Sequence, residues 1–291
     1  MMQWNQTLRF LSRWIVPPGF RDLAYLLAPS FRDKPPASPP LPPELALNSV
    51  CNQSQAGKRC FILATGPSIK QQDLRALRGE CCIAVSNFFV HPDFKYIRPR
   101  YYCLACHHPP ISEEAWADWM SRIDSALTRE TILFLPLDDK ERDERAGLFR
   151  DKDVHYLLYR GKWEEAEKSG VQLDRPVPGG QSVSIMAISI AVGLGCSEIY
   201  LLGCDHDWIL HLKESLHFYP EKDHALTSHG YSEWSETDLE KEFSANAELW
   251  RQYKMVARLA ASRGVSIYNA TEGGLLDVFP RVRLEDVLPQ S

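Results

Sequence analysis

Short apolar runs alternate with longer helical patterns along most of the chain. The short runs predict buried strands at 60–64, 82–86, 101–105, 131–135, 199–203 and 265–268. The longer patterns predict helices over 182–193 and 237–263, the second with Thr237 and Glu240 at capping-box spacing and Gly264 at its stop. Strands that alternate with helices predict an α/β fold. We expect a Rossmann-like, mostly parallel sheet with helices on both faces.

The first 34 residues follow a different pattern. Apolar side chains recur there at helical spacing, with arginines between them. We expect an amphipathic helical segment over 1–34, which could lie in a membrane interface or pack as an ordinary helix on the body or on another subunit. Residues 35–44 read as a stiff proline-rich linker. Residues 45–291 are then one Rossmann-like domain, with a lid-like loop near 206–236.

Composition and charge narrow the class of protein. A net charge of -5 without a long basic run argues against a nucleic-acid binder. The eight cysteines are scattered, several of them inside apolar runs, and residues 1–16 show no secretory signal. We therefore expect a cytoplasmic protein, peripheral at the inner membrane face if 1–34 binds lipid. No run of about 18 apolar residues predicts a membrane span.

The strand at 60–64 runs into a turn with candidate chemistry. Gly66 would let a ligand approach the backbone, Pro67 stiffens the turn, and Ser68 can donate a hydroxyl or cap a helix. We expect 69–77 to continue as a helix whose first amides favour a phosphate. The turn matches neither the P-loop nor the dinucleotide fingerprint. A plain Gly-Pro turn with a serine cap is the alternative.

Two further segments could meet an anion or a metal. Gly179-Gly180-Gln181-Ser182 opens the predicted helix at 182, as an anion-friendly loop or as a flexible loop with Ser182 as the N-cap. Asp205-His206-Asp207 follows the strand at 199–203. This pattern could hold a divalent metal near a diphosphate, or Asp205 could accept a hydroxyl without any metal.

Polar loops supply the remaining candidates. His217, in a loop that also holds His224 and His229, is either a general base or an ordinary surface histidine. The polar segment 268–274 follows the last strand, at the edge where ligands bind in such sheets. Residues 103–107 match the haem-attachment pattern Cys-x-x-Cys-His, but no export signal is present. Zinc binding there would be crowded, because neighbouring strand residues point to opposite faces.

Three of these segments, in this order, resemble a known group. Residues 64–68, the run 191–205 and residues 269–274 are similar to motifs of bacterial sialyltransferases of glycosyltransferase family 42. They are equally similar to the related domain of unknown function 115, whose members include archaeal 6-hydroxymethylpterin diphosphokinase. The resemblance covers about 58–280 and implies a nucleotide-binding Rossmann-like fold.

The resemblance also implies roles for single residues. His217 matches the catalytic histidine, Tyr219 or Tyr231 would donate to the departing phosphate, and Asp205 would shape the site. His108 stands where the family has an asparagine, and Thr65 replaces another. The implied nucleotide-binding residues are Thr65, Gly66, Pro67, Ser68, Asn87, His108, Gly180, Gln181, Ser182, Gly203, Asn269 and Thr271.

The activity implied is inverting transfer of a nonulosonic acid from a CMP-sugar to a glycan or lipid-linked glycan acceptor in lipopolysaccharide or capsule biosynthesis. His217 would take the acceptor proton, and no metal or other cofactor is needed. Two alternatives stay open. One is a Mg²⁺-dependent pyrophosphoryl transferase with Asp205 and Asp207 as metal ligands. The other is a non-catalytic component of polysaccharide assembly. A homo-oligomer is compatible with each of these.

Overall fold

The computed structural model describes residues 40–108, 111–211, 217–219 and 238–288. The chain divides into two units, Met1–Leu41 and Pro42–Ser291. The predicted helical segment 1–34 and most of the linker 35–44 lie outside the described residues and stay predictions, as does most of the lid-like loop. None of the described helices combines the length and apolar character that crossing a membrane requires.

Seven parallel strands form one sheet, as the alternating pattern predicts. The predicted strands are confirmed to within two residues at each end. The strand missing from the prediction is β5, at the sheet edge, where burial alternates and no continuous apolar run forms. The strands are β1 Arg59–Leu63, β2 Cys81–Val85, β3 Tyr101–Cys103, β4 Ile132–Pro136, β5 Asp153–Leu157, β6 Glu198–Leu202 and β7 Ser266–Asn269.

The strand order, β5-β4-β3-β2-β1-β6-β7, creates a switch point. The chain moves outward from β1 to β5 and then returns to place β6 on the other side of β1. Because connections leave in opposite directions there, the carboxyl ends of β1 and β6 flank the crevice where such sheets bind ligands. Leu63 pairs with both Ala84 of β2 and Leu202 of β6, so the residues after these three strands emerge side by side.

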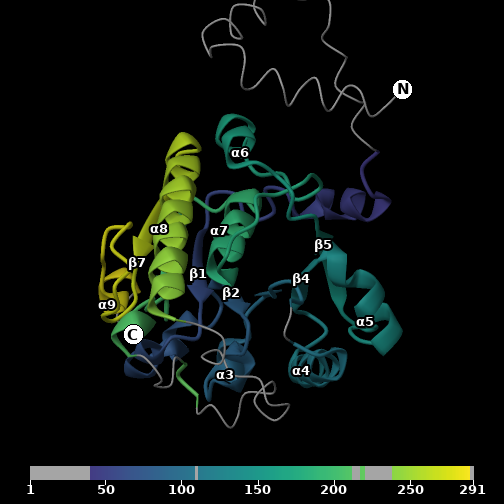
Figure 1. Ribbon diagram of the computed structural model, residues 1–291, viewed down its shortest axis with the longest axis horizontal. Coiled ribbons are helices and arrows are strands. Elements are labelled where there is room, and N and C mark those ends of the chain that lie inside the picture. Colours follow the sequence, from purple (N-terminus) through teal and green to yellow (C-terminus); the bar gives the residue numbers. More distant parts are fainter. Residues whose placement is uncertain (1–39, 109–110, 212–216, 220–237, 289–291) are drawn as a thin grey trace, which may run out of the picture. The chain divides into compact units, whose positions relative to one another are not determined.

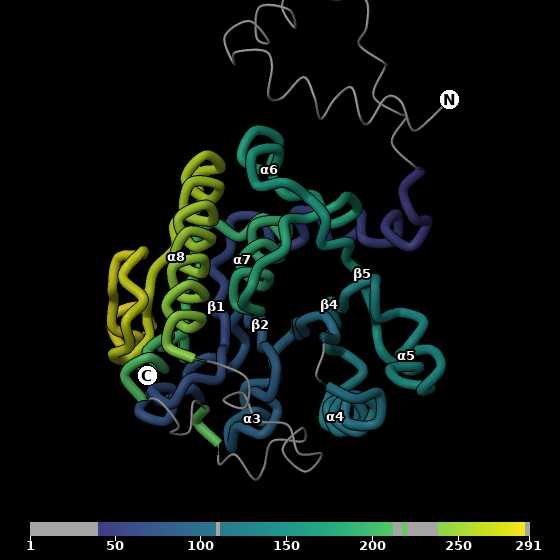
Figure 2. The backbone as a smooth tube through the Cα atoms, viewed as in Figure 1, coloured from purple at the N-terminus to yellow at the C-terminus, as the bar shows by residue number. Residues whose placement is uncertain are grey.

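Helices cover both faces, as predicted (Figure 1, Figure 2). One apolar core contains side chains of α6 Trp163–Ser169, α7 Val183–Gly193 and α8 Leu239–Ser262. The other contains side chains of α3 Phe94–Ile97, α4 Glu113–Ala126 and α9 Leu284–Val287. The short α5 is Lys140–Ala146. Ten consecutive residues of α7 are buried, which explains why it is apolar on every side.

Two local expectations need correction. The α8 N-cap is Asp238, whose side chain accepts a hydrogen bond from the Lys241 amide, one residue later than Thr237 predicts. The segment 69–77 is not one helix but two 3-10 turns, Pro67–Gln71 and Leu74–Leu77. Between them Gln72 is extended, and its buried side chain donates to the Ala270 carbonyl at 2.8 Å.

Candidate functional site

An open cavity of about 740 Å³ lies at the carboxyl ends of β1, β2 and β6, beside the switch point. The starts of α7 and α8 supply further wall residues. The structure thus brings together most of the residues that the sequence singles out. The predicted residues that line the cavity are Thr65, Gly66, Pro67, Ser68, Gln181, Ser182, Gly203, Asp205 and His217.

Gly66 is a glycine because the protein itself packs against it. A Cβ at this position would stand 1.8 Å from Asp205 Oδ2 and 2.5 Å from the Gly203 carbonyl oxygen. The Gly66 amide donates to that carbonyl at 2.8 Å, which extends the pairing of β1 with β6. The sequence predicts that a ligand approaches the Gly66 backbone closely. In the structure, the residues after β6 make this close approach.

Asp205 ties the turn after β1 to the end of β6. Its Oδ1 accepts from the Ser68 amide at 3.1 Å, and its Oδ2 accepts from Ser68 Oγ at 2.9 Å. Asp205 is only 6% exposed, and this burial raises the pKa of its carboxyl although the Ser68 bonds oppose the rise. Both carboxylate oxygens thus serve the turn, which gives Asp205 a positioning role.

The sequence predicts that the amides of this turn face a phosphate. In the structure, the protein itself accepts their hydrogen bonds. Gly66 donates to Gly203, Ser68 donates to Asp205, and the Ile69 amide donates to the Gly66 carbonyl at 3.3 Å. Pro67 has no N–H. A 3-10 turn of five residues also lacks the aligned peptides that give a long helix its dipole. Any phosphate at this wall would meet hydroxyls instead.

His217 is held over the end of β1. Its Nδ1 lies 3.3 Å from Thr65 Oγ1, and the Phe218 amide donates to the Thr65 carbonyl at 2.9 Å. Phe218 is buried against the rings of Phe88 and His91. Backbone pairing and an apolar anchor therefore fix the imidazole at the cavity wall.

A buried chain of polar side chains lies next to His217. The His217 ring stacks on Tyr219, with centroids 4.9 Å apart and planes 12° apart. Tyr219 Oη accepts from Asn87 Nδ2 at 3.0 Å, and Asn87 Oδ1 accepts from Trp119 Nε1 at 2.5 Å. Asn87 and Tyr219 do not line the cavity. They orient the imidazole from behind.

The side chains of Asn269 and Thr271, the two predicted site residues after β7, also contact the protein itself. Asn269 is fully buried, donating to the Leu276 carbonyl at 2.8 Å and accepting from the Thr271 amide at 3.0 Å. Thr271 Oγ1 accepts from the Cys204 amide at 3.0 Å. Neither lines the cavity, but Glu272 and Gly274 of the same segment do.

Two more predicted contacts lie off the cavity lining. Gly180 is required by packing, since a Cβ there would stand 2.5 Å from Ile185 Cγ2. His108 is exposed. Ser182 caps α7 by accepting from the Ser184 amide, which confirms the N-cap interpretation of that loop. His224, His229 and Tyr231 lie outside the described residues.

His206 lines the cavity next to Asp205 and Asp207. Aromatic rings of Trp208, Trp250 and Tyr253 surround it, and its Nε2 lies 2.6 Å from Tyr253 Oη. Burial lowers the pKa of its imidazole to about 4. The unfolded chain therefore binds this proton first as pH falls, so His206 destabilises the fold increasingly from about pH 6.5 down towards pH 4.

Several cavity residues escape sequence reasoning because they lie outside the turn motifs. On α8, Glu242 accepts from Trp208 Nε1 at 2.9 Å, linking the helix start to the segment after β6. Helical spacing of Glu242 and Ala245 is the signal that could have found them. The unpredicted lining residues with polar side chains are Gln71, Ser86, Ser184, Trp208, His211 and Glu242.

The described cavity wall is acidic, with no lysine or arginine and with Asp205, Asp207, Glu242 and Glu272. His211 Nε2 lies 3.7 Å from Asp207 Oδ2. Among the described residues these carboxylates do not converge as a group of three or more metal-ligand atoms. The Cys-x-x-Cys-His segment forms no such group either. Cys103 is buried beside Tyr159 instead, consistent with a core role.

Comparison with known proteins identifies the fold. The sequence matches no protein-family model and no curated protein. The sialyltransferase CstII from Campylobacter jejuni, in complex with the substrate analogue CMP-3FNeuAc, matches with a TM-score of 0.50 and 13% identity, over 80% of this chain and 89% of CstII. The monofunctional alpha-2,3-sialyltransferase Cst-I from the same organism gives a TM-score of 0.49 and 14% identity, over 81% and 83%. At this identity, the similarity to CstII shows that the two chains share an α/β fold. These comparisons do not support the resemblance to the diphosphokinase group.

Proposed function

We propose that this chain is a glycosyltransferase that moves a nonulosonic acid from a CMP-sugar to a glycan acceptor, with inversion and without a metal. The observation that carries the proposal is His217, fixed by Thr65 at the wall of a switch-point cavity. CstII, which shares this fold, is described in complex with a CMP-sugar analogue. A CMP-sugar and an acceptor hydroxyl would fit the volume of this cavity.

The chemistry follows from the tautomer of His217. When Nδ1–H is donated to Thr65 Oγ1, Nε2 carries the lone pair that can accept a proton. His217 Nε2 would take the proton of the acceptor hydroxyl as its oxygen bonds to the anomeric carbon. The bond from that carbon to the CMP phosphate breaks, and CMP leaves with the electron pair.

The departing CMP phosphate would meet an acidic cavity wall. Hydroxyls of Thr65, Ser86 and Ser182 line the cavity and can donate to a phosphate, whereas no described lining residue carries a fixed positive charge. The same carboxylates are the one observation that favours a Mg²⁺-dependent pyrophosphoryl transferase. In that case Asp207, which lines the cavity, would face the metal, whereas both carboxylate oxygens of Asp205 already accept hydrogen bonds from Ser68.

Thermal unfolding with nucleotides separates these functions. We expect CMP and CTP at about 100 times Kd to stabilise the fold by about 2.7 kcal/mol without Mg²⁺, because a ligand that binds only the folded chain shifts the equilibrium by mass action. UDP and GDP serve as matched controls and should shift the melting temperature less. A shift that needs both ATP and Mg²⁺ would support the pyrophosphoryl transferase. No shift with any nucleotide would favour a non-catalytic assembly protein.

A further inference from the structure

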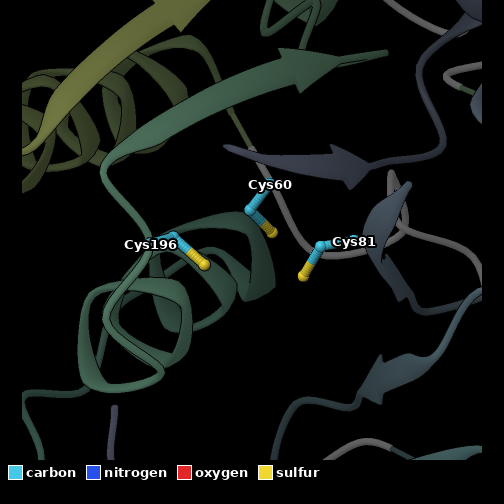
Figure 3. A group of neighbouring side chains, drawn as sticks. All are labelled: Cys60, Cys81 and Cys196. Atoms are coloured by element: carbon cyan, nitrogen blue, oxygen red, sulfur yellow. The ribbon is translucent and has the colours of Figure 1, made fainter. Parts of the chain in front are cut away.

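Three cysteines converge at the amino ends of the central strands, which is the end of the sheet opposite the cavity. Cys60 begins the buried part of β1, Cys81 begins β2, and Cys196 lies in the turn between α7 and β6. Their sulfur atoms all lie within 4.8 Å of one another, and Figure 3 shows the side chains turned into one common space. This is the only such group of metal-ligand atoms among the residues that the structure describes.

We propose that Cys60, Cys81 and Cys196 form a three-thiolate site for a thiophilic metal ion, with Zn²⁺ as the representative ion. Thiolates select ions such as Zn²⁺ and Cu⁺ over Mg²⁺ or Ca²⁺. Three sulfurs bound to one ion at about 2.3 Å would be about 4 Å apart, a spacing that sulfurs lying within 4.8 Å of one another can reach. The inference is independent of the proposed transferase activity.

The backbone holds the three positions in place. Cys60 and Cys81 are directly paired across β1 and β2. The Cys196 amide donates to the Ala191 carbonyl at 3.1 Å, which closes the end of α7. The strap 53–57 covers this turn through amides of Gln53, Gln55 and Gly57, which donate to the carbonyls at 193–195. The ligand positions therefore need little reorganisation on binding.

Charge and access also suit a metal. Lys58 and Arg100 place positive charges near the Cys81 sulfur. A divalent ion with three thiolates has a net charge of -1, which these two cations would offset. Cys81 is half-buried whereas Cys60 and Cys196 are closed off, so an ion would enter beside Cys81.

Cobalt substitution tests the site on the full-length protein. The reduced protein, freed of reductant under anaerobic conditions, is titrated with Co²⁺ and then with Zn²⁺. We expect a thiolate-to-cobalt charge-transfer band that saturates at one equivalent, disappears on adding Zn²⁺ and is accompanied by proton release. Zn²⁺ alone should raise the melting temperature. Absence of the band in the wild-type protein would overturn the proposal.

Substitutions of single cysteines test which residues bind the metal ion. Cys81→Ser should lose the band and the Zn²⁺ effect on melting, while its half-buried position should preserve the fold, which the melting curve without any ligand verifies. Cys82→Ala is the matched control, since Cys82 is the next residue but belongs to the core on the other face of the sheet, and it should keep both signals. A band kept in Cys81→Ser, or lost only in Cys82→Ala, would contradict the assignment. Free thiols are also counted in protein purified without reductant, where eight are expected. A count lower by two, with no cobalt band after reduction, would overturn the proposal and indicate a disulfide instead.

Discussion

Replacing His217 by alanine is expected to lower kcat for transfer by about 10²–10⁴-fold, the range that general-base catalysis usually supplies. This corresponds to about 3–5 kcal/mol of transition-state stabilisation. The fold should survive, because Phe218 and the pairing of its amide with Thr65, rather than the imidazole, anchor this segment. The measurement is release of CMP from CMP-N-acetylneuraminic acid with a β-galactoside acceptor.

The binding of CMP should change little in the His217→Ala variant, so that the effect falls on kcat and not on the affinity for the nucleotide. His107→Ala is the matched control. His107 is a half-buried histidine whose Nε2 lies 2.8 Å from the Ile111 carbonyl, outside the cavity lining. It should keep kcat near the wild-type value. Unchanged turnover in His217→Ala would remove the general-base assignment.

Replacing Gly66 by alanine should destabilise the protein by about 3 kcal/mol, at the upper end of the usual overpacking cost. The added methyl group would collide with Asp205 Oδ2 and the Gly203 carbonyl, so the turn must move away from β6. Movement of the turn would also displace Thr65, and with it the contact to His217. We therefore expect loss of both stability in chemical denaturation and CMP affinity.

Gly79→Ala is the control for this substitution. Gly79 has a left-handed backbone with φ of +89°, but no atom lies within 4 Å of the position that a Cβ would take, so about 1–2 kcal/mol of backbone strain alone is expected. The stability lost in the double variant Gly66→Ala/Asp205→Ala should be smaller than the sum of the two single losses, because the two sites are in contact. Full additivity of the two changes would show that the Asp205 carboxylate is not the obstacle.

The sheet could be predicted from the sequence because most of its strands are buried on both faces and appear as continuous apolar runs. β5 could not, because an edge strand with partial burial lacks that signal. The position of the cavity was equally predictable. Polar residues after parallel strands must meet at one edge, which is how Thr65, Asp205 and Gly203 came together.

The direction of each side chain could not be predicted from motifs. Asn269 and Thr271 satisfy buried backbone groups, and Asn87 supports Tyr219 behind the cavity. A motif records that a polar residue is needed at a strand end, but not whether it faces a ligand or the protein. The thiol triangle was missed for a related reason, because Cys60, Cys81 and Cys196 are far apart in sequence and meet only through the strand order.

Turnover of a CMP-sugar by the wild-type protein in excess EDTA is the decisive test of metal-independent transfer. We expect that CMP is released from CMP-N-acetylneuraminic acid without Mg²⁺, faster with a glycan acceptor, at a rate that Mg²⁺ leaves unchanged. Absence of CMP release under these conditions, together with Mg²⁺-dependent consumption of ATP, would contradict it.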